Sequence, residues 1–160
     1  MRINYSDTSS PLGNIRLAAK LNGLMGCYFH GQKYFPNCSD WQHSPENPLL
    51  NQVSKNLRGY FADGIMQLDF ELDMQGTDFQ KQVWRALLNI PLGEVITYSD
   101  LAVSVGRPQS VRAAAAAVGR NPLSIIVPCH RVIGKNNQLT GYAGGLKRKQ
   151  KLLELEKQSH

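Results

Sequence analysis

Length, composition and charge restrict what this chain of 160 residues can be. Its hydrophobic share of 42% is that of a globular protein, and no apolar stretch approaches the roughly 18 residues of a membrane helix. We therefore expect one domain or two small ones, and no membrane partner. The polar first ten residues lack the apolar core of a secretory signal, which predicts a cytoplasmic protein whose three cysteines are thiols.

The chain is basic, with 18 Lys+Arg against 12 Asp+Glu, and this favours polyanionic partners. The imbalance is local, because residues 107–151 contain nine lysines and arginines and no acidic residue. A basic stretch is often only a solvated surface, so charge alone leaves nucleic-acid binding as one of two interpretations.

Residues 1–75 have the pattern of a small α/β domain. The turn sequences Ser10-Pro11-Leu12-Gly13 and Asn22-Gly23 separate short apolar runs, which is typical of β-hairpins. Apolar residues at helical spacing predict a helix over 49–61, and alternation predicts a strand over 68–72. We expect a small antiparallel sheet packed with a helix.

From residue 76 the pattern is mainly helical. Thr77 and Gln80 have the spacing of a capping box ahead of an apolar helix face. A short helix over 99–106 is predicted to begin at Ser99 as its cap and to end at a glycine. A turn at 107–110 then leads into a second helix over 111–118. The pair predicts a helix-turn-helix, although many such pairs only pack together.

The second of these helices contains five consecutive alanines, residues 113–117. Small side chains permit close packing against neighbouring helices. They equally permit close approach to a nucleic-acid groove, with Arg112 as the one long side chain. The sequence leaves both interpretations open.

The apolar run 123–127 predicts a buried extended segment, closed by a proline, from which Cys129 emerges. His130 follows, and a thiol with an ordinary pKa of about 8.5 needs a base to react at neutral pH. Neighbours in an extended segment point to opposite sides, so we expect a water to bridge the two side chains. Glu156, on the apolar face of a predicted helix over 146–157, is a candidate to orient the imidazole. Without further context, a buried structural Cys-His pair remains the alternative.

A longer signature surrounds this cysteine. The nonapeptide Ile126-Val127-Pro128-Cys129-His130-Arg131-Val132-Ile133-Gly134 closely resembles the active-site signature of the O6-alkylguanine-DNA alkyltransferases. The resemblance continues through the C-terminal half in Gly93-Glu94-Val95, Tyr98, Arg112, Gly119-Arg120-Asn121-Pro122, Tyr142-Ala143-Gly144-Gly145-Leu146 and Glu156. It implies a ribonuclease H-like α/β domain over 1–75 and a winged-helix-like DNA-binding and alkyl-acceptor domain over 76–160.

The resemblance also implies an activity, which is DNA repair by direct damage reversal. The alkyl group of O6-alkylguanine, and less so of O4-alkylthymine, passes irreversibly from double-stranded DNA to Cys129. We expect a monomer that needs no cofactor. The resemblance implies that His130, backed by Glu156, deprotonates the thiol through water.

Further roles follow from the same resemblance. Asn121 joins the helix-turn-helix to the active-site segment, and Tyr98 donates a hydrogen bond to the flipped guanine. Arg112 enters the base stack in place of the extruded nucleotide. The resemblance assigns DNA contacts to Arg112, Ala113, Ala116 and Arg120, and the base pocket to Tyr98, Val132, Ala143 and Gly144.

The chain departs from the family pattern at two places. Ala143 stands where some members have a serine, so only a backbone amide is available there for the base. Some members carry a structural zinc, but its ligand positions fall here on Met1, Lys20, Met25 and Asp69, and we expect no metal of that kind. The spacing of Cys27, His30, Cys38 and His43 fits no familiar zinc pattern either.

Three other functions remain as alternatives. A lesion-binding alkyltransferase-like protein lacks the acceptor cysteine, so Cys129 argues against that class. A helix-turn-helix regulator does not require the Pro-Cys-His-Arg segment. A cysteine hydrolase needs an oxyanion hole, which nothing in the sequence indicates.

Overall fold

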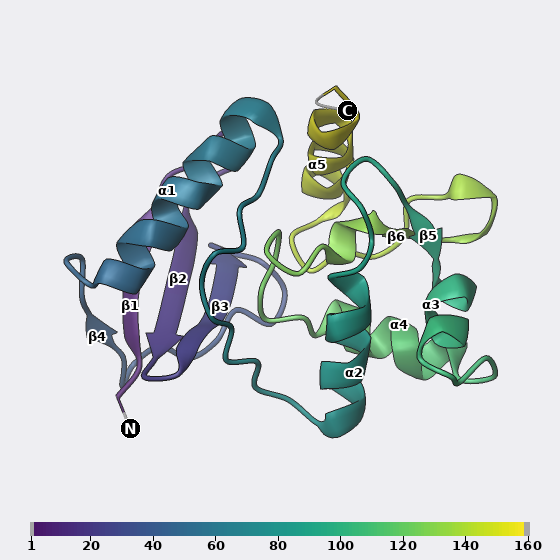
Figure 1. Ribbon diagram of the computed structural model, residues 1–160, viewed down its shortest axis with the longest axis horizontal. Coiled ribbons are helices and arrows are strands. Elements are labelled where there is room, and N and C mark those ends of the chain that lie inside the picture. Colours follow the sequence, from purple (N-terminus) through teal and green to yellow (C-terminus); the bar gives the residue numbers. More distant parts are fainter. Residues whose placement is uncertain (1, 159–160) are drawn as a thin grey trace.

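The computed structural model describes residues 2–158. Met1, one of the four positions considered for zinc, lies outside the described residues. Figure 1 shows two halves side by side: a sheet covered by one long helix, α1, and a group of shorter helices formed by the rest of the chain. The predicted division into an α/β half followed by a mainly helical half is therefore confirmed.

The N-terminal half contains a four-stranded sheet of order β3-β2-β1-β4. Strands β1 (Asn4–Thr8), β2 (Ile15–Lys20) and β3 (Gly23–Phe29) are antiparallel, and the turn at Asn22-Gly23 joins β2 to β3 as predicted. The short β4 (Gln42–His43) pairs in parallel with β1, so the sheet is mixed rather than wholly antiparallel. Gly23 is required here because a Cβ would lie 2.6 Å from the Glu71 carbonyl oxygen.

Helix α1 (Pro48–Asp63) confirms the helix predicted over 49–61. The Asn47 side chain caps it by accepting from the Leu50 amide at 3.1 Å, and Gly64 ends it in the left-handed conformation. Four residues at helical spacing form its buried face: Leu50, Val53, Leu57 and Tyr60. This face packs on the sheet.

The strand predicted over 68–72 is absent. Only Leu72 forms a bridge, with Leu24 at the beginning of β3. Further along the same edge, Cys27 pairs with Leu123 of the C-terminal half: the Cys27 amide donates to the Pro122 carbonyl at 2.8 Å. Because two segments share the edge of β3, neither extends into a strand. This shared edge also joins the two halves by backbone hydrogen bonds.

Within its described residues, the C-terminal half contains four helices, two short parallel strands and two 3₁₀ turns. These are α2 (Asp78–Leu87), β5 (Ile96–Thr97), α3 (Tyr98–Ser104), α4 (Val111–Gly119), η1 (Cys129–Arg131), β6 (Val132–Ile133), η2 (Lys135–Asn137) and α5 (Leu146–Gln158). The capping box predicted for α2 is present at Thr77 and Gln80. The cap predicted for α3 at Ser99 is wrong, because Thr97 fills that position in a capping box with Asp100.

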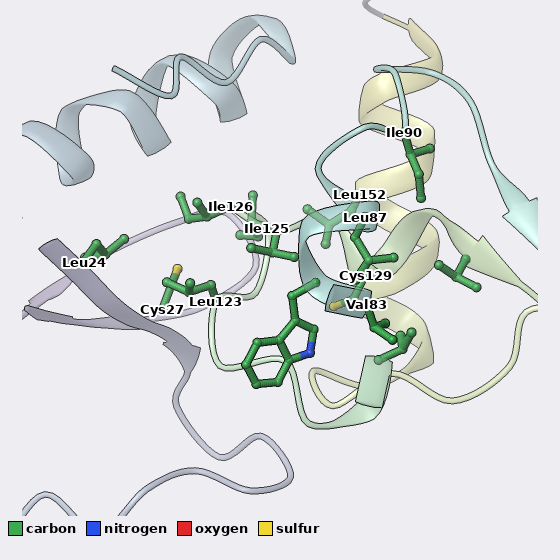
Figure 2. Close-up of a cluster of buried hydrophobic side chains, with 14 of the residues drawn as sticks. Leu24, Cys27, Val83, Leu87, Ile90, Leu123, Ile125, Ile126, Cys129 and Leu152 are labelled. Carbon is green, nitrogen blue, oxygen red and sulfur yellow. The ribbon is translucent and has the colours of Figure 1, made fainter. Parts of the chain in front are cut away.

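The buried core runs through both halves without interruption. Figure 2 shows Cys27 of β3 beside Leu123 of the C-terminal half, in a cluster that extends from Leu24 of β3 to Leu87 of α2. Helices α2 and α4 pack closely, and the Trp84 indole donates to the Ala117 carbonyl at 2.8 Å. Within residues 2–158, no helix combines the length and apolar character that crossing a bilayer requires.

Candidate active site

Cys129 lies inside the protein at the start of η1, with 4% of its surface exposed. Burial raises the pKa of the Cys129 thiol to about 11, although a hydrogen bond with Asn121 and the positive charge of Lys149 act in the opposite direction. The thiol is therefore protonated at neutral pH. To react as a nucleophile it must transfer its proton to a base.

The segment before Cys129 is a turn, so the extended run predicted over 123–127 is wrong. The Val127 amide donates to the Leu123 carbonyl at 2.8 Å, and Ile125 has a φ of 72°. A left-handed backbone is rare for a β-branched residue and is maintained here by burial in the core (Figure 2). The cysteine and the histidine after it both belong to a helical turn. The expectation that their side chains point to opposite sides assumed an extended segment, so it does not apply to them.

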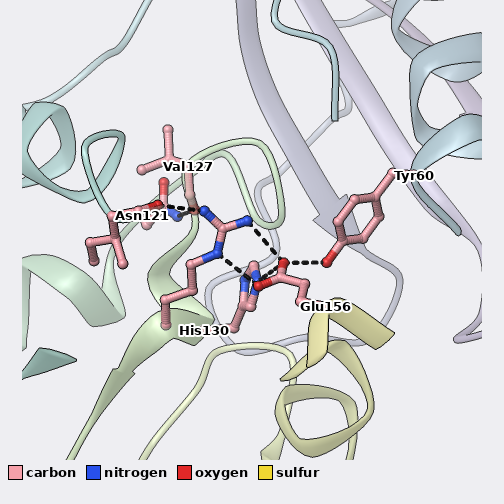
Figure 3. Close-up of polar contacts among 7 residues, drawn as sticks. Tyr60, Asn121, Val127, His130 and Glu156 are labelled. Atoms are coloured by element: carbon pink, nitrogen blue, oxygen red, sulfur yellow. Dashed lines mark hydrogen bonds and ion pairs between the residues drawn. The ribbon is translucent and has the colours of Figure 1, made fainter. Parts of the chain in front are cut away.

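Asn121 connects the end of α4 to the segment that carries Cys129. Its Nδ2 donates to the Val127 carbonyl at 2.9 Å, and its Oδ1 accepts from the Leu123 amide at 2.9 Å. Figure 3 shows the side chain directed at this turn. Because Asn121 is 4% exposed and both ends of its amide are bonded, it links the turn to the helix-turn-helix.

His130 and Glu156 form a buried pair behind the cysteine. His130 Nε2 lies 2.6 Å from Glu156 Oε2 (Figure 3). An ionised carboxylate only accepts, so Nε2 carries the hydrogen and Nδ1 is the basic nitrogen. Nδ1 is buried and has no hydrogen-bond partner among the described residues. Burial lowers the pKa of His130 more than the carboxylate raises it, which keeps the imidazole neutral and able to accept a proton.

Glu156 is bound by three side chains. Arg131 donates from Nε to Oε1 at 2.8 Å and from Nη2 to Oε2 at 3.0 Å. Tyr60 of α1 donates to Oε2 at 2.6 Å, so the N-terminal half also contacts this carboxylate (Figure 3). Burial disfavours the charged form of Glu156, but the hydrogen bonds from His130, Arg131 and Tyr60 outweigh it and lower the pKa to about 2.

Lys149 of α5 places a positive charge near the thiol. Its Nζ donates to the Val132 carbonyl at 2.6 Å and to the Thr140 carbonyl at 2.8 Å. Burial lowers the pKa of Lys149 to about 8, which leaves it mostly protonated at neutral pH. The ammonium therefore favours the thiolate of Cys129 and also connects β6 to the loop that contains Thr140.

A cavity of about 600 Å³ opens close to this buried group. Its walls include Lys33 and Tyr34 of the N-terminal half, Ala116 and Arg120 of the α4 region, and Tyr98, Thr140, Tyr142 and Ala143. Of the residues predicted around a base, Tyr98 and Ala143 line the cavity, whereas Val132 and Gly144 are buried and do not. The ring of Tyr142 also packs edge-on against His130, with the centroids 6.5 Å apart. It therefore connects the cavity to the buried pair.

The Tyr98 hydroxyl is available as a hydrogen-bond donor in this cavity. It accepts from the Thr140 hydroxyl at 3.4 Å, which leaves its own proton free. Tyr98 is the first residue of α3, so the capping box at Thr97 and Asp100 fixes the backbone that presents it.

The four residues predicted at the DNA occupy one exposed face of the α4 region: Arg112, Ala113, Ala116 and Arg120. Their offsets of one, four and eight residues place them on neighbouring positions of a helix. Ala114 and Ala117 face the core instead, so the close-packing interpretation of the alanine run is confirmed for that side. The exposed side is smooth and basic, as contact with a groove requires.

The described residues include no group of three or more His, Cys, Asp or Glu side chains positioned to bind a metal ion. Of the cysteines and histidines considered earlier, His30 instead lies 3.2 Å from an Asp7 oxygen. Cys27 is fully buried, and burial raises the pKa of its thiol.

Comparison with known proteins accounts for both halves. The family model of the 6-O-methylguanine DNA methyltransferase ribonuclease-like domain matches residues 3–74, and that of the DNA binding domain matches residues 78–158. The chain belongs to this methyltransferase family. Methylated-DNA--protein-cysteine methyltransferases of Mycobacterium tuberculosis and Methanosarcina barkeri are each 44% identical to it, over 97% and 95% of this chain and 93% and 96% of theirs.

Solved structures of the family agree with the fold. The crystal structure of the Mycobacterium tuberculosis O6-methylguanine methyltransferase matches with a TM-score of 0.90 and 43% identity, over 99% of this chain and 94% of that one. A structure of the same enzyme in complex with DNA matches with a TM-score of 0.90 and 42% identity, over 98% and 94% of the two chains. The methyltransferase of Methanococcus jannaschii has a TM-score of 0.66 at 28% identity, over 95% and 93% of the two chains.

Three residues of this methyltransferase site were missed by the sequence reasoning. Lys149 had a usable signal, because it lies three residues before Leu152 and seven before Glu156, on the same buried face of α5. Arg131 lies within the signature itself, but its contact with Glu156 depends on η1. Tyr60 gave no signal, because it has the spacing of an ordinary apolar residue of α1 and lies 96 residues from its partner.

Proposed function

We propose that this methyltransferase family member repairs alkylated DNA by transferring the alkyl group from guanine O6 to Cys129. The observation that carries the proposal is the buried cysteine, protonated at rest, beside a neutral His130 that Glu156 holds with Nδ1 as its basic nitrogen. A structural Cys-His pair does not require a basic nitrogen without a partner. The family membership and the DNA complex of the Mycobacterium tuberculosis relative support the same reaction.

The transfer is a single displacement at the alkyl carbon. A water passes the Cys129 proton to His130 Nδ1, the sulfur attacks the carbon, and the bond from carbon to guanine O6 breaks. Negative charge then develops on the leaving base. The Tyr98 hydroxyl donates to that base in the cavity, and Lys149 stabilises the thiolate before attack. The released guanine takes up one proton while His130 gives one up, so protons balance and the thioether remains.

The base reaches the cavity by leaving the helix stack, because a duplex hides guanine O6 from a buried sulfur. In this proposal the exposed face of α4 lies in the minor groove, where Ala113 and Ala116 allow close approach. Arg112 fills the gap left by the extruded nucleotide. O4-alkylthymine is a second, poorer substrate for the same displacement, with its O4 as the leaving atom. We assign this activity to a cytoplasmic monomer that needs no cofactor.

Intact mass spectrometry tests the proposal directly. The protein is incubated with a duplex that contains one O6-methylguanine, and then weighed and digested. We expect a gain of one methylene confined to the peptide that contains Cys129. An unchanged mass, or a gain on another residue, contradicts the proposal. Incubation with the unmodified duplex is the control.

A further inference from the structure

Two cations and one aromatic ring meet at the wall of the cavity, Lys33 and Tyr34 from the N-terminal half and Arg120 from the C-terminal half. The Arg120 guanidinium lies 4.0 Å from the centre of the Tyr34 ring, and Lys33 Nζ lies 5.1 Å from the same centre. All three residues line the cavity that contains Tyr98 and Ala143. The ring of Tyr34 therefore positions two positive charges, one from each half of the protein.

The loop that carries Lys33 and Tyr34 is fixed in place. The Lys33 amide donates to the carbonyl of Ala143, which also lines the cavity, at 2.9 Å. Tyr34 has a φ of 63°, a left-handed backbone that disfavours a side chain by roughly 1 to 2 kcal/mol. The ring is nevertheless 50% exposed, so its burial in a core does not offset that strain. An exposed aromatic residue in a strained backbone is more typical of a binding surface than of packing.

The charge at this wall is not neutralised within the described part of the chain. The cavity is lined by no aspartate or glutamate, and the described ion pairs involve neither Lys33 nor Arg120. Two cations near one ring repel each other, and an anion between or beside them offsets that repulsion. A phosphodiester meets this requirement, because guanidinium and ammonium groups both donate to its oxygens.

We propose that Lys33 and Arg120, aligned by Tyr34, bind a phosphate of the lesion strand next to the extruded nucleotide. This inference rests on the proposed function, since it assigns a strand contact to the same cavity. It makes the N-terminal half part of the DNA-binding surface. The helix-turn-helix binds the groove, and the loop of residues 33–34 contacts the strand from which the base has left.

Salt-dependent binding measures this contact. Each phosphate contact contributes about 0.9 to the slope of log affinity against log salt concentration. Lys33→Gln should weaken binding to a lesion duplex and lower that slope by about 0.9. The affinity ratio of wild type to variant should then shrink about threefold between 50 and 200 mM salt. Lys55→Gln removes a charge from the exposed face of α1 and is the matched control, expected to bind as wild type does.

Two further measurements separate the contact from a folding defect. Tyr34→Asn keeps the net charge and tolerates the left-handed backbone, so a loss of DNA affinity there reports lost alignment of the two cations. Free O6-benzylguanine has no phosphate. Lys33→Gln should therefore reduce the transfer rate from duplex DNA by a factor at least ten times larger than the factor by which it reduces the rate from O6-benzylguanine. Equal losses on the two substrates would point to damage to the active site.

The outcomes distinguish this inference from the proposed function. A salt slope for Lys33→Gln equal to that of wild type and of Lys55→Gln overturns the phosphate contact. Absence of any mass gain on Cys129 in the wild type overturns the proposed function, even where Lys33→Gln reduces DNA binding. A reduced slope together with normal methylation in the wild type supports both.

Discussion

Replacing Glu156 by glutamine should destabilise the protein in a way that depends on pH. The substitution keeps the size of the side chain but removes the charge that Arg131, His130 and Tyr60 bind. Because the pKa of Glu156 falls from an ordinary 4.5 to about 2, and each pKa unit is worth about 1.4 kcal/mol, the charge contributes roughly 3 kcal/mol above pH 5. That is a large part of the stability of a small domain.

The sign of the pH dependence follows from the direction of that pKa shift. A carboxyl whose pKa is lowered by folding stabilises the folded state above its unfolded pKa, and the stabilisation is lost as pH falls towards the folded pKa. The contribution of Glu156 is therefore complete above about pH 5. Between pH 6 and pH 3 the wild type should lose roughly 2 kcal/mol that Glu156→Gln cannot lose. The lowered pKa of His130 acts in the same direction from about pH 6.5 downwards in both proteins.

Urea unfolding at several pH values between 7 and 3 measures this difference. The variant should be about 3 kcal/mol less stable at pH 7, and the gap should narrow below pH 4.5. Glu154→Gln, on the exposed side of the same helix, is the matched control and should change the free energy of unfolding by less than about 0.5 kcal/mol. A gap that stays constant over the whole pH range would mean that Glu156 acts through packing rather than charge.

The remaining substitutions separate chemistry from DNA binding. Cys129→Ser should abolish methyl transfer but keep affinity for a lesion duplex, because the groove contacts lie on α4. Gel-shift and mass measurements on one preparation test both expectations. Retained transfer in this variant would refute the assignment of Cys129 as the acceptor. Arg112→Ala should slow transfer from duplex DNA far more than from free O6-benzylguanine, which needs no extrusion. Equal losses on the two substrates would assign Arg112 a folding role instead.

Sequence periodicity predicted the elements whose hydrophobic faces are continuous. Helix α1 and the β2–β3 hairpin appeared where expected, because their apolar spacing and their turn residues agree. The strand over 68–72 failed because strand formation depends on a free sheet edge, and Pro122 and Leu123 occupy the rest of that edge. The cap of α3 was placed two residues late because two hydroxyl residues compete. Thr97 is the cap because Asp100, three residues further on, completes a capping box with it.

The site was predictable to the extent that its residues are close in sequence or share a helix face. Glu156 was found because a carboxylate beside Leu152 needs a partner, and the same reasoning applied to Lys149 would have found that residue too. The phenol of Tyr60 could not be found in this way. Its contact exists only because α1 and α5 meet in the folded chain.

Methylation of Cys129 should lower the stability of the protein. The residue is 4% exposed, and the valines at positions 127 and 132 are fully buried, so an added methyl enters a packed region. Overpacking of this kind costs typically 1 to 3 kcal/mol. The thiol is also hydrogen-bonded to Asn121. Methylation weakens this hydrogen bond, because a thioether is only a weak acceptor. Both effects disturb the side chain that connects the active-site turn to α4.

We therefore expect the methylated protein to melt several degrees below the unmodified form, since about 1 kcal/mol corresponds to roughly 2 to 4 °C at this size. It should also release DNA more readily, because Asn121 transmits the strain to the DNA-binding helix. Larger alkyl groups should lower the midpoint further. Thermal unfolding of both forms measures the effect, with protein incubated with unmodified DNA as the control. An equal or higher midpoint after methylation would mean that the space around the sulfur accepts the methyl group without strain.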